Sequence, residues 1–277
     1  MVPRSYLFVP GNRPERFDKA QASGADAVVL DLEDAVAPDD KAGARDAVAR
    51  YLATAGEALR ARLVLRINDT ATPWFDADIA MLASARARSV MLPKAEDLHT
   101  VARLRGECPG IDVLALIESA RGVLQAEALA AAEGVSRLVF GTLDFALDLD
   151  LLDDPAVGPL GLDAAASRLA WASRAAALPP PVAGVTPDID DPTRLQADFA
   201  RARAHGFGAK LCIHPKQVAW VHQALAPSAA ELDWAQRVMA AAAQSSGAVR
   251  VDDRMVDKPV VERARRLLAR AALQPGS

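Results

Sequence analysis

Eight short apolar runs recur along the chain, and the segments between them carry apolar residues at helical spacing. The runs begin at Ser5, Asp26, Arg62, Ser89, Asp112, Arg137, Pro181 and Gly208. Near-continuous apolar strands that alternate with helices indicate a parallel sheet covered on both faces. We therefore predict an α/β fold, a TIM (β/α)8 barrel over residues 1–226. An open doubly wound sheet is the alternative, but VPGNRPERF after the first run lacks that fold's glycine fingerprint.

Residues 227–277 follow the last strand of the predicted barrel and cannot join its closed sheet. Ser228 and Glu231 form a capping-box pattern, which predicts a helix that runs to about Gln244. The extended piece GAVRVDDRM and a second helix from about Pro259 follow it. We expect this helical extension to act as a lid that packs on a neighbouring subunit, so that the protein forms a homo-oligomer.

The longest connection between predicted strands runs from Phe145 to Pro181. It contains the acidic run LDLDLLDDP, which we expect to be a solvated loop over the site, and a helix in AAASRLAWASRAAA. Arg62 and Arg137 lie at the upstream ends of their strands, where we expect both side chains to be solvated.

Composition changes this picture mainly by excluding some classes of partner. The net charge of −4 argues against binding to nucleic acid or to an anionic membrane. No apolar run suits a signal peptide or a membrane span. Cys108 and Cys212 match no metal or redox spacing, so we expect reduced thiols in a cytoplasmic protein.

Polar residues collect at the downstream ends of the predicted strands, where TIM barrels carry their active sites. These residues are Asn12, Arg13, Asp31, Glu33, Asp34, Arg66, Asn68, Lys94, Glu118, Asp144, Thr186, Asp188 and His214. The pattern therefore predicts one active site at the carboxyl end of the barrel.

Two of these residues, Glu118 and Asp144, follow neighbouring strands of a β-α-β unit whose helix spans about Ala120–Ala132. Parallel neighbours would bring the two carboxylates within about 5 Å of each other. Like charges at that separation repel unless they share a cation, and Mg²⁺ is often held by one or two carboxylates. We therefore predict a magnesium site, although each acid alone could instead cap the helix that follows.

The guanidinium group of Arg66 could bind a substrate carboxylate or carbonyl through paired hydrogen bonds of fixed geometry, or it could pair with a surface acid. Magnesium does not need Asp31, Glu33 and Asp34 as well, so we expect at least one of them to orient Arg66 or Lys94. Lys94 is the candidate for imine chemistry, but that would need desolvation, which the nearby acids oppose.

Three further positions have both a functional and a structural interpretation. His214, which precedes a proline, is either a general base or a hydrogen-bonded structural residue. Asp257 in RMVDKP lies where a helix N-cap belongs. The helix start at Arg13 offers amide groups to a phosphate or a carboxylate.

Taken together, the motifs of the chain resemble the citrate lyase beta-subunit-like branch of the HpcH/HpaI aldolase superfamily. In order, they are LFVPGNRPERFDKA, DLEDAVAPDDKAGAR, LRIN, LPKAED, LIESARG, GTLDF, GFGAKLCIHPKQV and RMVDKP, and they span nearly the whole chain. The resemblance implies a TIM barrel that binds magnesium and forms a homotrimer or a hexamer. It also implies an enzyme that makes or breaks a carbon–carbon bond between an acyl thioester and a keto acid.

The resemblance assigns residues by motif. Glu118 of LIESARG and Asp144 of GTLDF would be the metal ligands, and Arg66 of LRIN would hold the keto acid. Asp257 of RMVDKP would reach the active site of a neighbouring subunit as an acid/base catalyst. The chain departs from the family pattern at one motif: many relatives read Gly-Ala-Glu-Asp where this chain reads Gly141-Thr142-Leu143-Asp144. The predicted metal ligand Asp144 is kept, but the missing glutamate bears on which substrate the pocket accepts.

The expected function is magnesium-dependent cleavage of a β-hydroxyacyl thioester, such as malyl-CoA, citramalyl-CoA or a citryl thioester, to a keto acid and a short acyl thioester. Alternatives are the beta subunit of a multi-protein citrate lyase that acts on an acyl-carrier-protein thioester, a CoA thioester hydrolase, and a barrel that only binds. The expected catalytic residues are Arg66 and Asp257, and the expected substrate-binding residues are Arg13, Arg66, Lys94, Glu118 and Asp144.

Overall fold

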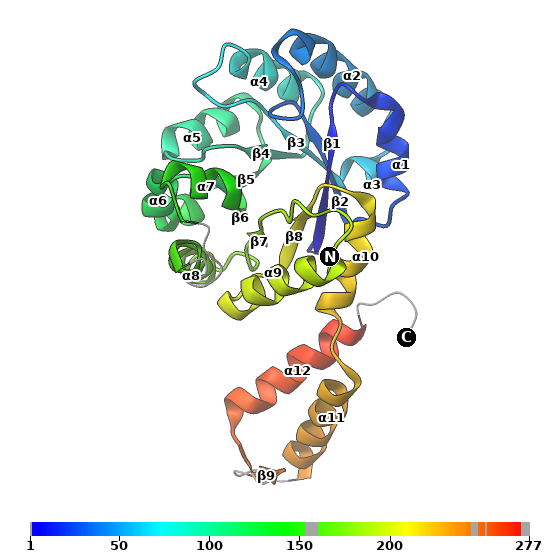
Figure 1. Cartoon of the computed structure of the whole chain (residues 1–277), viewed down its shortest axis with the longest axis vertical. Helices are drawn as coiled ribbons and strands as arrows, with labels where there is room; N and C mark the ends of the chain where they lie inside the picture. Colours follow the sequence, from blue (N-terminus) through cyan, green and yellow to red (C-terminus); the bar gives the residue numbers. More distant parts are fainter. Residues whose placement is uncertain (1, 153–159, 245–248, 253, 273–277) are drawn as a thin grey trace. The chain divides into compact units, whose positions relative to one another are not determined.

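The computed structural model describes residues 2–152, 160–244, 249–252 and 254–272. The chain divides into two compact units, Met1–His222 and Gln223–Ser277. The first unit is built on a closed barrel, and the second contains a pair of long helices (Figure 1).

Eight parallel strands form the barrel in sequence order, and the last strand closes it by pairing with the first. The strands are β1 Ser5–Pro10, β2 Ala27–Asp31, β3 Leu63–Arg66, β4 Ser89–Leu92, β5 Asp112–Ile117, β6 Val135–Phe140, β7 Val182–Ala183 and β8 Ala209–Cys212. Each strand overlaps one of the predicted apolar runs, so the predicted TIM barrel is confirmed.

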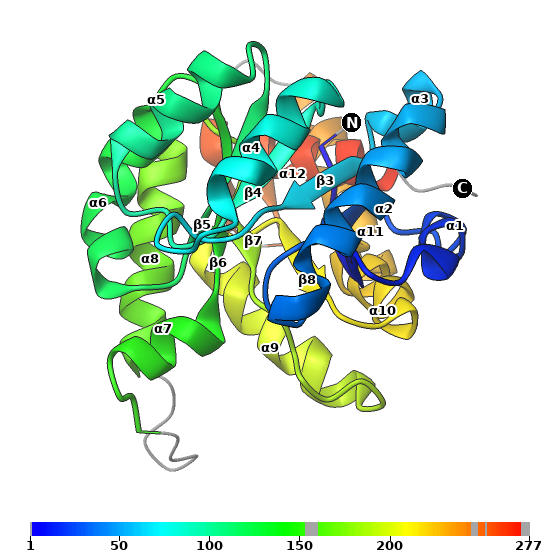
Figure 2. The same ribbon diagram turned by 90° about the horizontal axis from the view of Figure 1, so that it is seen from above.

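Helices cover the outside of the barrel (Figures 1 and 2). The longer ones are α2 Lys41–Thr54, α4 Phe75–Ser84, α5 Leu98–Glu107, α6 Ala120–Ala131, α8 Leu160–Ala175, α9 Pro192–His205 and α10 Pro215–Leu225. The shorter ones are α1 Phe17–Gln21, α3 Glu57–Arg60, α7 Thr142–Asp148 and the 3-10 helices η1 Pro14–Arg16 and η2 Pro38–Asp40. The acidic run at 147–155 begins within α7, and its residues 153–155 lie outside the described part of the chain.

Alternate residues of the eight strands fill the barrel interior, as the twofold period of a strand requires. This core includes Tyr6, Val29, Val64, Met91, Leu114, Leu116, Val139, Val182 and Leu211, all buried. Because the interior is packed with apolar side chains, polar chemistry is confined to the ends of the barrel.

The expectation that Arg62 and Arg137 are solvated is wrong. Arg137 is only 3% exposed, and it donates hydrogen bonds to Pro3 O at 2.6 Å and Pro180 O at 2.7 Å. Arg62 is half-buried and donates to Ala25 O at 2.6 Å. Backbone carbonyls from distant segments therefore pair with both guanidinium groups at the upstream end of the barrel.

The second unit contains α11 Ala229–Gln244, an antiparallel hairpin of β9 Val249–Val251 and β10 Arg254–Val256, and α12 Lys258–Ala272. The predicted capping box is confirmed, since Ser228 N–H donates to Glu231 Oε2 at 2.8 Å and Glu231 N–H donates to Ser228 Oγ at 3.2 Å. The predicted extended piece is a two-stranded hairpin. The two helices share an apolar core that includes Ala235, Val238, Ala264 and Leu267. Among the described helices, none has both the length and the apolar character that crossing a membrane requires.

Candidate active site

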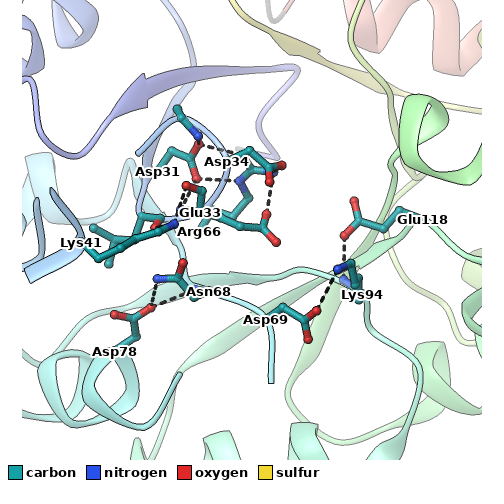
Figure 3. Close-up of polar contacts among 12 residues, drawn as sticks. Asp31, Glu33, Asp34, Lys41, Arg66, Asn68, Asp69, Asp78, Lys94 and Glu118 are labelled. Carbon is teal, nitrogen blue, oxygen red and sulfur yellow. Dashed lines mark hydrogen bonds and ion pairs between the residues drawn. The ribbon is translucent and has the colours of Figure 1, made fainter. Parts of the chain in front are cut away.

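Arg66 is the centre of the polar network at the carboxyl end of the barrel (Figure 3). It ends β3, and the parallel register places it beside Asp31 at the end of β2. Its Nε and Nη2 donate to the two Asp31 carboxylate oxygens at 2.7 and 2.6 Å, and its Nη1 lies 2.8 Å from Glu33 Oε2 and 3.2 Å from Asp34 Oδ2. The expectation that an acid of this run orients Arg66 is therefore confirmed.

The surroundings of Arg66 keep it charged. Burial alone would lower the pKa of this guanidinium, but the adjacent carboxylates, with Asp31 first, raise it above its ordinary value. The guanidinium also lies over the ring of Phe8, 4.9 Å from the ring centre. The bidentate contact with the Asp31 carboxylate and the face of the Phe8 ring together fix the plane of the Arg66 guanidinium group.

Lys41 supports the acid-bearing loop after β2, a role that the sequence analysis missed. This lysine is 6% exposed, and its Nζ donates to Leu32 O at 2.8 Å and Glu33 O at 2.7 Å. It therefore fixes the backbone that carries Glu33. The spacing of Lys41 from DLED gave no indication of these contacts, because they form only when η2 turns the chain back.

Glu118 directly follows β5 and is 5% exposed. Its Oε1 accepts a hydrogen bond from the backbone N–H of Lys94 at 2.8 Å. Burial raises the pKa of Glu118 from 4.5 to about 7; the Lys94 hydrogen bond opposes the rise, and the charge of Asp144 adds to it. A buried carboxyl with such a pKa needs a nearby cation to be fully ionised at neutral pH.

Asp144 lies in the first turn of α7 and is exposed. The prediction placed it at the end of β6, but β6 ends at Phe140 and Gly141 to Leu143 intervene. Its negative charge is nevertheless among the causes that raise the pKa of Glu118, which agrees with a shared site. The side chain does not cap α7, because the N-cap is Gly141 and makes no side-chain hydrogen bond.

Lys94 follows β4 and adopts a left-handed backbone conformation, with φ of +42°. Its Nζ donates to Asp69 Oδ2 at 2.9 Å, and this hydrogen bond is the main reason that the pKa of Lys94 is raised. A lysine with a raised pKa is a poor imine nucleophile. Burial alone would raise the pKa of Asp69, but the Lys94 hydrogen bond and two bonds within its own loop lower it.

The residues at this edge fit a divalent cation. Asp31, Glu33, Asp34, Glu118 and Asp144 outnumber the cationic side chains around them, and one of those cations, Arg66, is already paired with Asp31, Glu33 and Asp34. Burial, with the charges of the neighbouring acids, raises the pKa of Glu33 to about 8 although Arg66 opposes the rise. Among the described residues, no group of three or more acids, histidines or cysteines is arranged to hold a metal. Two carboxylates completed by water and substrate oxygens suit Mg²⁺.

Other predicted site residues make local contacts. The Arg13 side chain is 51% exposed and lies 3.6 Å from Glu15. His214 Nδ1 accepts from Lys216 N–H at 3.2 Å, which agrees with its structural interpretation. Thr186 is buried and donates to Asp198 at 2.8 Å.

Asp257, in the second unit, is exposed and accepts at Oδ1 from Val260 N–H at 3.2 Å. This hydrogen bond makes Asp257 the N-cap of α12.

The fold and this edge define a TIM barrel with an acid-rich site for a divalent cation beside a fixed arginine. The chain belongs to the HpcH/HpaI aldolase/citrate lyase family, which matches residues 4–215, and residues 177–274 match a second family, the C–C bond lyases of the TIM-barrel fold. The resemblance found in the sequence is therefore confirmed.

Relatives cover nearly the whole chain. It is 38% identical over 270 residues to a citrate lyase subunit beta-like protein of Mycobacterium tuberculosis, covering 96% of this chain and 94% of the relative. It is 34% identical over 272 residues to a (3S)-malyl-CoA thioesterase of Cereibacter sphaeroides, with 97% and 94% covered. The crystal structure of CitE from M. tuberculosis with magnesium, acetoacetate and coenzyme A is similar with a TM-score of 0.87, 37% identity and 98% of each chain covered.

Proposed function

We propose that this protein is a magnesium-dependent lyase that cleaves a β-hydroxyacyl-CoA thioester, such as malyl-CoA or citramalyl-CoA, to a keto acid and a short acyl-CoA. The observation that carries the proposal is the buried carboxyl group of Glu118, which needs a nearby cation when it is ionised, at the same barrel edge as the fixed guanidinium group of Arg66. The family and the relative whose structure holds magnesium, acetoacetate and coenzyme A support it.

In this proposal Glu118 and Asp144 hold the magnesium ion, which when bound supplies positive charge to the oxygens of the keto-acid fragment. Arg66 has five N–H groups, and its hydrogen bonds to Asp31 and Asp34 use three of them. A remaining N–H of Nη2 is suited to the hydroxyl oxygen that becomes the keto oxygen.

The chemical step then balances as follows. The β-hydroxyl passes its proton to the Asp257 carboxylate of a neighbouring subunit, its oxygen forms the carbonyl of the keto acid, and the Cα–Cβ bond breaks. The electron pair of that bond passes to the α-carbon of the thioester and forms an enolate. We assign the proton that converts this enolate to the acyl-CoA to Asp257 of a neighbouring subunit, with Lys94 and Arg13 as further substrate-binding residues.

Turnover of a panel of CoA thioesters by an Asp144→Asn variant tests the proposal. Asp144 is exposed, so we expect the variant to fold and to lose most of its magnesium-dependent release of glyoxylate, pyruvate or oxaloacetate. Asp46→Asn, which removes an exposed acid from α2, is the matched control. Wild-type turnover in Asp144→Asn would refute the metal role of this residue.

A thioester hydrolase is the second candidate, because a relative 34% identical over 272 residues is a (3S)-malyl-CoA thioesterase. Hydrolysis consumes water and gives malate and free CoA, whereas cleavage gives glyoxylate and acetyl-CoA. Product analysis with malyl-CoA separates the two reactions. Activity only on an acyl-carrier-protein thioester, together with partner chains, would instead indicate the beta subunit of a citrate lyase.

We further propose that the protein is a cytoplasmic homotrimer or hexamer. The separate second unit and the exposed side chain of Asp257 support a role for this unit at a neighbouring subunit's site. Both cysteines, Cys108 and Cys212, are unpaired and buried, which suits a reducing compartment.

A further inference from the structure

We propose that Asp69 and Lys94 form a positioning pair, which holds the Glu118 carboxylate in the orientation that binds a divalent cation. The inference rests on the proposed function, because it takes Glu118 as a metal ligand. In this role both residues act through Glu118, and cation binding measured without substrate separates it from the substrate contact proposed above for Lys94.

The backbone of Lys94 provides the first observation. Its φ of +42° lies in the left-handed region, which side chains other than glycine rarely occupy without support from their surroundings. In this conformation the Lys94 N–H donates to Glu118 Oε1 at 2.8 Å. The next residue is anchored, since Ala95 N–H donates to Leu116 O at 3.0 Å, so another φ at Lys94 would rotate the peptide plane that carries the Lys94 N–H.

The Lys94 side chain provides the support. Although it is 53% exposed, its Nζ is tied to Asp69 Oδ2 at 2.9 Å, and the Asp69 side chain is only 12% exposed. Asp69 is itself fixed, since its Oδ1 accepts from Ala71 N–H at 3.1 Å and from Thr70 Oγ1 at 3.2 Å. The pair therefore links the loop after β3 to the loop after β4 (Figure 3).

Gly141 confines Glu118 from another side. A Cβ at this position would lie 2.6 Å from both Cβ and Oε2 of Glu118, closer than side-chain atoms normally approach. The Glu118 carboxylate is thus held between the Lys94 N–H and the Gly141 backbone. Loss of the N–H contact would remove one of these two constraints on the carboxylate.

For a variant that lacks the Lys94 side chain, a purely electrostatic role and a positioning role predict opposite changes in cation affinity. Removal of a lysine near a cation site lowers repulsion and should tighten cation binding. Removal of a positioning group should weaken it, and loss of partners that orient metal ligands typically costs about 10- to 100-fold in affinity. The direction of the change in Lys94→Ala therefore separates the two roles.

We would measure Mn²⁺ binding to the full-length protein by calorimetry. Lys94→Ala and Asp69→Asn are each expected to weaken binding by about 10-fold or more. The double variant is expected to bind no more weakly than Lys94→Ala, because both changes break one contact. Lys94→Gly should recover part of the loss, since glycine adopts a positive φ freely. Lys19→Ala, which removes an exposed lysine from α1, is the control.

Binding to Lys94→Ala at or above wild-type strength, or no recovery in Lys94→Gly, would overturn the inference. Glu118→Gln distinguishes this outcome from failure of the proposed function. If Glu118→Gln binds Mn²⁺ as tightly as the wild type does, Glu118 is not a ligand and the proposed metal site is wrong. If Glu118→Gln alone loses binding, the metal site stands and the positioning pair is wrong.

Discussion

Replacement of Glu118 by glutamine is expected to stabilise the metal-free protein at alkaline pH while abolishing magnesium binding. Glu118 is 5% exposed, and burial raises its pKa from 4.5 to about 7. Its ionised form is therefore unfavourable in the folded state without a cation. Glutamine keeps an oxygen that can accept the Lys94 N–H hydrogen bond, but it carries no charge.

The pH range and size of the effect follow from the pKa. A carboxyl whose folded pKa is raised binds its proton more tightly in the folded state, so its contribution to stability is present below pH 4.5 and is lost as the pH rises to about 7. Each pH unit between these values is worth ~1.4 kcal/mol. The penalty above pH 7 is therefore roughly 3 kcal/mol, as an order of magnitude.

Urea unfolding with a chelator, at several pH values between 5 and 9, measures this effect. The free energy of unfolding of Glu118→Gln should exceed that of the wild type by an amount that grows with pH and levels off above pH 7. Glu127→Gln, at a 71% exposed side chain on α6, should show no such trend. Lower stability of Glu118→Gln at pH 8, or a difference that is independent of pH, would refute the reasoning.

Three other substitutions have expected outcomes. Gly141→Ala should weaken magnesium binding measured by calorimetry, because the new Cβ would lie 2.6 Å from Glu118 Oε2. Arg66→Lys replaces a bidentate fork on Asp31 by a point charge and should lower kcat on the order of 100-fold in a keto-acid release assay, with the protein still folded. Arg137→Ala leaves buried carbonyls unpaired and should lower the free energy of unfolding by about 1–3 kcal/mol in a urea titration, without a change in magnesium affinity.

The sequence predicted those parts of the structure that depend on neighbouring residues. The apolar runs gave the strands because a buried strand must be apolar on both faces. The capping box of Ser228 and Glu231 was visible because both of its hydrogen bonds join residues three apart. The position of Glu118 at the carboxyl end of the barrel was predictable because it directly follows a strand whose neighbours could be deduced from chain order.

The features that the sequence did not predict depend on contacts between distant segments. Arg137 can be buried because it donates to backbone carbonyls 43 and 134 residues away. Every residue has a backbone carbonyl, so residue types do not reveal such partners. Lys94 has a left-handed backbone, where residue type alone would favour glycine, and its side chain is bonded to Asp69, 25 residues away. Asp144 lies in α7 rather than at the end of β6, because the boundary between strand and helix in GTLDF has no proline or cap residue to mark it.

The raised pKa of Glu118 makes one further prediction, that magnesium binding releases protons near neutral pH. At pH 7 about half of the Glu118 carboxyls carry a proton in the metal-free protein, since the pKa is about 7. A metal ligand must be ionised, so magnesium displaces this proton and its apparent affinity should rise with pH up to about 8. Calorimetry in two buffers of different ionisation enthalpy measures the release, and we expect at least half a proton at pH 7, since Glu33 with a pKa of about 8 can add to the release from Glu118, and much less at pH 9. Equal binding enthalpies in the two buffers at pH 7 would show that Glu118 is already ionised, and the proposed need for a cation at this carboxylate would then be wrong.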